Sequence, residues 1–116
     1  MYLPKHFEQH DRAALAALMR EHPLATLVTL QDGQATADHI PLLYDSDDGE
    51  FGTLRGHVAR ANPLWKAAAG SRVLAVFNGV EAYISPSWYA SKATTHKVVP
   101  TWNYAVVHAH GALRSV

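Results

Sequence analysis

The amino-acid sequence predicts a mainly β domain of the α+β class, a six-stranded β-barrel with two short helices. Six short segments are rich in strand-forming residues, and only two segments carry helical signals. The segments do not alternate in the strand-helix-strand order of a doubly wound sheet. A chain of 116 residues is long enough for one hydrophobic core. We therefore expect residues 1–116 to form a single domain.

The first helix is expected directly after an extended start. Leu15, Leu18 and Met19 follow helical spacing, and the pattern continues to residue 22. Asp11 is placed to cap this helix and Pro23 to end it.

A β-hairpin is expected after the first helix. Residues 24–30 and 35–43 have strand composition, and Asp32-Gly33 between them is a strong signal for a tight turn. Pro41 cannot donate to a strand ladder, so it indicates an edge strand or a bulge.

A third strand, residues 53–58, leads into the second helix. Asn62 is a good N-cap, Pro63 suits the first helical position, and residues 64–69 are mostly helix-forming. Gly70 lies where a glycine typically ends a helix.

The last part of the chain is expected to hold three strands. Residues 72–77 and 82–84 have strand composition, with a predicted turn at Asn78-Gly79 between them. Residues 85–100 are irregular, and residues 101–113 are the last strand candidate.

Composition excludes several classes of function. Ten Lys plus Arg balance ten Asp plus Glu, so the basic excess typical of DNA-binding domains is missing. The chain has no cysteine, which excludes disulfides, thiolate metal sites and cysteine nucleophiles. The serine motif of hydrolases and the glycine motif of dinucleotide-binding folds are both missing. With no apolar leader and no run of roughly 18 apolar residues, we expect a cytoplasmic protein without a membrane segment.

Residues 55–62 could bind a phosphate group. A predicted strand brings Arg55, His57 and Arg60 to a loop that opens into a helix at Asn62. Helix N-terminal N–H groups favour anions, and an arginine can add a charge-assisted contact. The alternative is that Arg60 makes a surface ion pair and Asn62 only caps the helix.

Aromatic and hydroxyl residues gather in two later segments, residues 82–89 (AYISPSWY) and 99–104 (VPTWNY). They could wall a flat heteroaromatic ligand, although an ordinary aromatic core would have the same composition. His108 and His110 share one face of the last strand, but no third ligand is indicated, so we expect no metal site.

Four separated motifs, in this order, give the chain a specific resemblance. Residues 1–7 (MYLPKHF), 56–65 (GHVARANPLW), 83–89 (YISPSWY) and 99–104 (VPTWNY) resemble the PaiB family of FMN-binding negative transcriptional regulators. The resemblance implies the split β-barrel of pyridoxamine-phosphate oxidases and flavin reductases, with FMN in the groove between two subunits of a homodimer. PaiB-like proteins normally continue further, so we expect a C-terminal portion of the relatives to be missing after Val116.

The resemblance also implies roles for individual residues. It assigns the FMN phosphate to His57, Arg60 and Asn62, with Arg55 less closely tied to the shared motif. The other two motifs place five residues near the flavin ring or the dimer groove: Trp88, Tyr89, Thr101, Trp102 and Asn103.

The family name implies repression of genes for sporulation and degradative enzymes. The sequence has no helix-turn-helix, since several strands separate its two predicted helices. We therefore expect a flavin-binding module that acts without direct DNA contact. One alternative is an FMN-dependent oxidoreductase of the flavin-reductase or pyridoxamine-phosphate-oxidase type, and another is a haem-binding split barrel. No residue stands out as a catalytic acid or base, which leaves enzymatic activity open.

Overall fold

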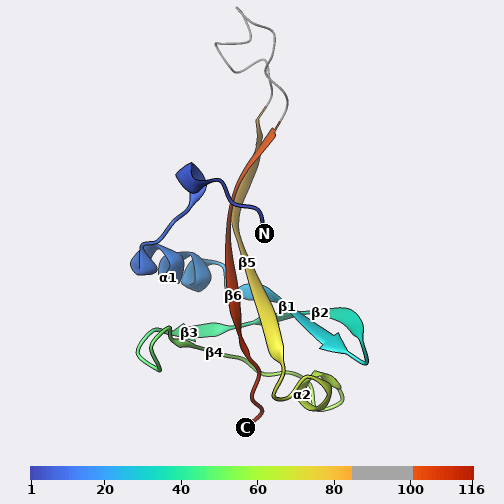
Figure 1. The fold of residues 1–116 in the computed structure, drawn as a ribbon. Coiled ribbons are helices and arrows are strands. Elements are labelled where there is room, and N and C mark those ends of the chain that lie inside the picture. Colours follow the sequence, from blue (N-terminus) through green and yellow to red (C-terminus); the bar gives the residue numbers. More distant parts are fainter. Residues whose placement is uncertain (85–100) are drawn as a thin grey trace, which may run out of the picture.

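The computed structural model describes the backbone of residues 1–84 and 101–116, and the side chains of residues 1–80 and 104–116. It is mainly β, with six strands and two short α-helices, so the predicted class is confirmed (Figure 1). The elements in chain order are the 3-10 helix η1 (Lys5–Phe7), α1 (Arg12–Glu21), β1 (Leu24–Gln31), β2 (Gln34–Pro41), β3 (Leu43–Asp45), β4 (Thr53–Arg55), α2 (Leu64–Ala67), β5 (Arg72–Ile84) and β6 (Thr101–Ala112).

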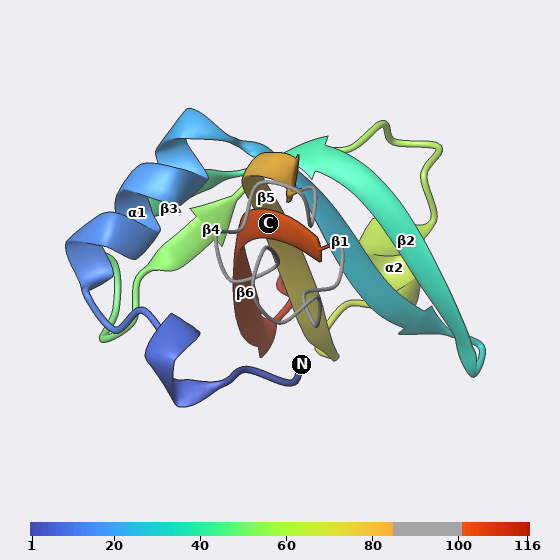
Figure 2. The same cartoon turned by 90° about the horizontal axis from the view of Figure 1, so that it is seen from above.

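The strands form two antiparallel sheets. The larger sheet has the order β2-β1-β5-β6, and β3 pairs with β4 in a separate two-stranded sheet. Within the described part of the chain, no strand ladder joins these sheets into a closed barrel. Figure 2 shows α1 with β3 and β4 on one side of the β5–β6 hairpin, and β1, β2 and α2 on the other.

Local signals correctly predicted the first helix and the first hairpin. The Asp11 carboxylate accepts a hydrogen bond from the Ala13 N–H at 3.0 Å and so caps α1. Asp32 and Gly33 both have positive φ, 53° and 77°, as a two-residue type I′ turn requires. Pro41 ends β2, which is an edge strand of the larger sheet, as expected from its missing N–H donor.

Three predicted segments proved too long. The strand predicted over residues 35–43 divides at Leu42 into β2 and β3, and the Leu42 N–H donates to the Pro23 carbonyl at 2.9 Å, in register with the β1–β2 pairing. The third strand ends at Arg55 rather than residue 58, and the second helix ends at Ala67 rather than residue 69.

The predicted turn at Asn78-Gly79 is wrong. Residues 72–84 form one continuous strand, β5, which pairs with β6 on both sides of this dipeptide. Asn78 pairs with Val106, and the ladder resumes where Glu81 pairs with Tyr104 after a register shift. A bulge can take up extra residues without reversing the chain, so ladder pairing on both sides outweighs the local turn propensity.

The hydrophobic core lies on one face of the larger sheet. Alternate residues of β1 point inward, and Leu27 pairs with Ala75 of β5. Phe77 of β5 is fully buried and pairs with Val107 of β6. The rest of the core comes from Met19 of α1, Leu42 between β2 and β3, Leu64 of α2, and Ala68 directly after α2. Among the described helices, none is long and apolar enough to cross a membrane.

We expect Phe77→Ala to lower the free energy of unfolding by about 3–5 kcal/mol, because it removes the largest fully buried side chain and leaves a cavity. Leu30→Ala, on the neighbouring strand β1 but 64% exposed, is the matched control and should stay within about 0.5 kcal/mol of wild type. Urea denaturation of both variants measures this difference. Similar losses for the two would contradict the assigned core.

Candidate functional site

A groove of about 1340 Å³ opens on the described part of the molecule. Its floor comes from core-facing residues of the larger sheet, such as Leu27, Ala75 and Val107. One wall is the segment from Phe51 to Arg60, which leaves β4 and leads towards α2, and the other includes the end of β6 and the residues after it. Sites for single small ligands typically measure about 300–1,000 Å³, so the groove is large enough for a flat ligand of nucleotide size.

The charged side chains around the groove are all basic. No aspartate or glutamate lines it among the described residues, although the whole chain has ten of each sign of charge. The basic lining residues are Arg12, Arg60, Arg114, His57, His108 and His110. An apolar floor with a basic margin suits a ligand that combines a flat ring system with an anionic group.

Residues 56–60 run close against the end of β2. A Cβ atom on Gly56 would lie 2.9 Å from the Pro41 carbonyl oxygen and 2.6 Å from the Leu42 side chain, so only glycine allows this approach. The close passage sets where the next residue, His57, joins the groove wall.

Hydrogen bonds hold the loop between His57 and α2 in one conformation. The Asn62 N–H donates to the Ala59 carbonyl at 2.9 Å, and the Asn62 side-chain oxygen accepts from the Leu64 N–H at 2.9 Å. The Asn62 amide nitrogen donates to the Asp38 carboxylate of β2 at 2.9 Å. On the other side of the loop, the Trp65 indole N–H donates to the Arg60 carbonyl at 3.0 Å. The loop is thus tied to both β2 and α2.

Most of the N–H groups at the start of α2 are hydrogen-bonded within the chain. The helix has only four residues, so its dipole is small. The Leu64 N–H binds Asn62, while the N–H groups of Lys66 and Ala67 bind the Pro63 carbonyl. The basic side chains that line this part of the groove are those of Arg60 and His57.

Of the four residues predicted to bind phosphate, the structure brings two together in the groove. His57 and Arg60 line it, whereas Asn62 is half-buried beside it and is engaged by Asp38 and Leu64. Arg55 is not among the lining residues.

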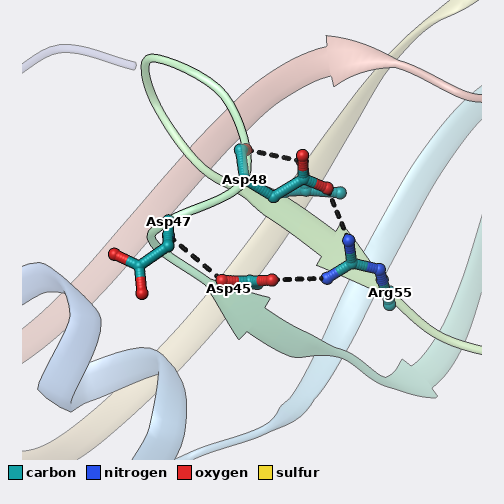
Figure 3. Close-up of polar contacts among 5 residues, drawn as sticks. Asp45, Asp47, Asp48 and Arg55 are labelled. Atoms are coloured by element: carbon teal, nitrogen blue, oxygen red, sulfur yellow. Dashed lines mark hydrogen bonds and ion pairs between the residues drawn. The ribbon is translucent and has the colours of Figure 1, made fainter.

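The Arg55 guanidinium instead binds two carboxylates of the β3–β4 hairpin, Asp45 at 2.9 Å and Asp48 at 2.5 Å (Figure 3). These contacts lower the pKa of the Asp45 carboxyl, with a further contribution from the Asp47 N–H, and raise the pKa of Arg55. All three charged side chains remain partly exposed, so the pairs mainly neutralise Arg55 rather than stabilise the fold.

The second group of predicted ligand residues lies elsewhere. Trp88 and Tyr89 fall outside the described residues. The backbone of residues 101–103 begins β6 and pairs with residues 82–84. Along an extended strand, Thr101 is about 20 Å from Val107, where β6 begins to line the groove. Within one chain, the backbone of residues 101–103 therefore lies about 14–20 Å along β6 from the groove that His57 and Arg60 line.

Residues that the sequence analysis did not single out also shape the site. Asp38 and Trp65 hold the loop, and two side chains tie the other end of the groove wall. The Tyr44 hydroxyl donates to the Phe51 carbonyl, and the Arg12 guanidinium donates to the Glu50 carbonyl, both at 2.8 Å. Trp65 was visible as the last residue of the second motif, whereas no local pattern pointed to Asp38.

His108 and His110 lie two residues apart on β6 and both border the groove. Within residues 1–80 and 104–116, no group of three or more histidine, aspartate or glutamate side chains could hold a metal ion. Partial burial lowers the pKa of His108, and the positive charges of the chain's N-terminus and of His110 lower it further. His108 is therefore expected to be neutral at neutral pH.

Comparison with known proteins identifies the family. A family model described as "Putative FMN-binding domain" matches residues 1–116. The chain belongs to this family. The resemblance to PaiB is also confirmed, because the protein named "Protease synthase and sporulation protein PAI 2" of Bacillus subtilis (strain 168) is 38% identical over 112 residues.

The PAI 2 alignment covers 96% of this chain and 51% of PAI 2, so the chain spans about half the length of that relative. An uncharacterized protein of Saccharomyces cerevisiae is 35% identical over 136 residues, covering 100% of this chain and 79% of the yeast protein. Another, from Emericella nidulans, is 34% identical over 141 residues, covering 98% of this chain and 56% of the relative.

The lowered pKa of His108 predicts a loss of stability in mild acid. As the pH falls below the ordinary value of 6.5, the unfolded chain takes up this proton before the folded chain does. The stability contributed by the neutral side chain is present above that pH and is lost below it. We expect the melting temperature of His108→Gln to decline less than that of the wild type between about pH 7 and 5. His110 is an exposed residue on the same strand, and we expect His110→Gln to keep most of the wild-type decline. An unchanged decline in His108→Gln would contradict the assignment.

Proposed function

We propose that this PaiB-like chain binds FMN in the groove and acts as a flavin-binding regulatory module. The observation that carries the proposal is the combination of an apolar floor with a margin whose charged residues are all basic. FMN has a flat ring system and a phosphate group, and the groove offers surfaces suited to both. Membership of a family described as FMN-binding supports the same ligand.

In this proposal, Arg60 and His57 hold the phosphate and Asn62 fixes the loop that carries them. His57 contributes charge only when its imidazole is protonated, so its part should depend on pH. Arg55, neutralised by Asp45 and Asp48, is left out of the proposed contacts. Bound FMN would supply reversible redox chemistry, while the chain's own residues bind and orient it.

The visible absorption spectrum of the purified protein tests the cofactor. A flavin spectrum, or its appearance on adding FMN with a saturable change in flavin fluorescence, is the expected result. A haem spectrum, or no binding of FMN, would overturn the proposal. Bleaching of the flavin band by NAD(P)H would indicate an oxidoreductase in place of a purely regulatory module.

We expect Arg60→Ala to weaken FMN binding by about ten- to a hundredfold, equivalent to about 1.5–3 kcal/mol, with little change for riboflavin. The two ligands differ only in the phosphate group that Arg60 is proposed to contact. Arg55→Ala is the matched control, because it also removes an arginine guanidinium, but one outside the groove. It should leave the ratio of the two Kd values unchanged. Fluorescence titration of both ligands measures the ratio. Equal losses for FMN and riboflavin in Arg60→Ala would remove Arg60 from the phosphate site.

We also propose a homodimer in which each groove is completed by the partner. The proposal is supported by the distance along β6 between the groove and residues 101–103, whose motif the PaiB resemblance places near the flavin. In a dimer, Trp88, Tyr89, Thr101, Trp102 and Asn103 of one chain would lie near the FMN bound to the other. The exposed apolar residues Val80 and Tyr104, 75% and 67% exposed, could form part of the contact.

Light scattering at micromolar protein concentration, with and without FMN, tests the dimer. The expected mass is twice that of one chain, and FMN should shift any remaining monomer towards the dimer. A single-chain mass in the presence of FMN would contradict the shared groove.

The printed name of PAI 2 connects that relative with protease synthesis and sporulation. We propose that this chain likewise acts as a negative regulator of such genes, without touching DNA itself. Its net charge of zero supports an indirect route, because sequence-independent DNA affinity comes mainly from basic surplus.

A further inference from the structure

We propose that Asp38 and Trp65 are positioning residues that set the preference of the site for FMN over riboflavin. They act by fixing the main chain on either side of Arg60. This inference rests on the proposed FMN site and deepens it.

Asp38 fixes the orientation of the Asn62 side chain. It lies on β2 opposite Leu27, and so on the face of the sheet that carries the core. An ionised carboxylate only accepts hydrogen bonds, so the Asn62 amide must turn its nitrogen towards Asp38. The amide oxygen is then directed at the Leu64 N–H and accepts a hydrogen bond from it at 2.9 Å. A carboxylate 24 residues away in sequence thus selects the capping orientation of Asn62.

Trp65 fixes the other side of the loop. Its indole N–H donates to the carbonyl of Arg60 itself, at 3.0 Å, and its half-buried ring also lines the groove. Leu64, the preceding residue, is 2% exposed and anchored in the core. The main chain of Arg60 is thereby held by a residue whose own position is set by core packing.

The two contacts have a common consequence for ligand selectivity. Arg60 is exposed, and a long exposed side chain gives up conformational freedom when it binds a phosphate. Fixing its main chain in advance reduces the freedom that must be lost on binding. The benefit applies to the ligand with a phosphate, so loosening the loop should reduce FMN affinity and spare riboflavin.

Trp65→Phe tests the indole contact, because it keeps an aromatic ring and removes only the N–H donor. We expect the Kd for FMN to rise about two- to tenfold, with the Kd for riboflavin nearly unchanged. Tyr44→Phe is the matched control. It removes one donor to a main-chain carbonyl, that of Phe51, at the other end of the same groove wall, and should leave the FMN-to-riboflavin ratio unchanged.

Asp38→Ala and Asp38→Asn test the carboxylate contact. The alanine variant loses the acceptor and should raise the Kd for FMN at least about threefold. The asparagine variant keeps an acceptor oxygen and should recover most of the lost preference. Thermal unfolding of each variant shows whether the fold is retained, and the ratio of Kd values separates selectivity from general loss of binding.

A double-mutant cycle distinguishes positioning from an independent effect. If Trp65 acts through Arg60, adding Trp65→Phe to Arg60→Ala should cost little further FMN affinity. Fully additive losses, or an unchanged ratio in both Trp65→Phe and Asp38→Ala, would overturn the positioning role while leaving the FMN site in place. A wild-type protein with no preference for FMN over riboflavin would instead remove the phosphate site, and this inference with it.

Discussion

The pairing of strand β5 with β1 on one side and β6 on the other determines where the rest of the molecule lies. Residues 74–76 of β5 pair with β1, while β6 pairs along nearly its whole length. The half of β5 between β1 and β6 carries Phe77 at its end and forms the core and the groove floor. The other half extends beyond the rest of the described molecule (Figure 1). The groove and the backbone of residues 101–103 thus lie at opposite ends of the β5–β6 pairing.

The distribution of charge, rather than its total, makes the groove suitable for an anion. Three aspartates lie near one another in the β3–β4 hairpin, and two of them neutralise Arg55 (Figure 3). The carboxylate that binds the loop, that of Asp38, is directed at an amide and does not line the groove. The amino-acid composition gives only the net charge of the whole chain, which is zero. It therefore cannot show the local excess of basic side chains in the groove.

The sequence correctly predicted features that depend only on residues adjacent in the chain. The cap of α1 at Asp11 and the turn at Asp32-Gly33 need only adjacent backbone groups, and both formed as expected. Asn78-Gly79 has an equally strong turn signal, but β6 pairs with the chain on both sides of it, which outweighs the local preference. In the site, the capping role of the Asn62 side-chain oxygen could be predicted from the sequence. The contact between the Asn62 amide nitrogen and Asp38 could not, because strand register and not sequence proximity brings these two residues together.

An anion site built from loop side chains behaves differently from one built on a long helix. Helix N–H groups keep their position as long as the helix is folded. In the proposed site the basic side chains are those of Arg60 and His57, so their placement would depend on a few hydrogen bonds in the loop. In the proposed dimer, a ligand in a groove of 1340 Å³ would be covered partly by its own chain and partly by the partner. FMN binding and subunit association would then stabilise each other by mass action. Such linkage lets the supply of FMN change the assembly state of the protein, which is a signal that needs no DNA contact by this chain.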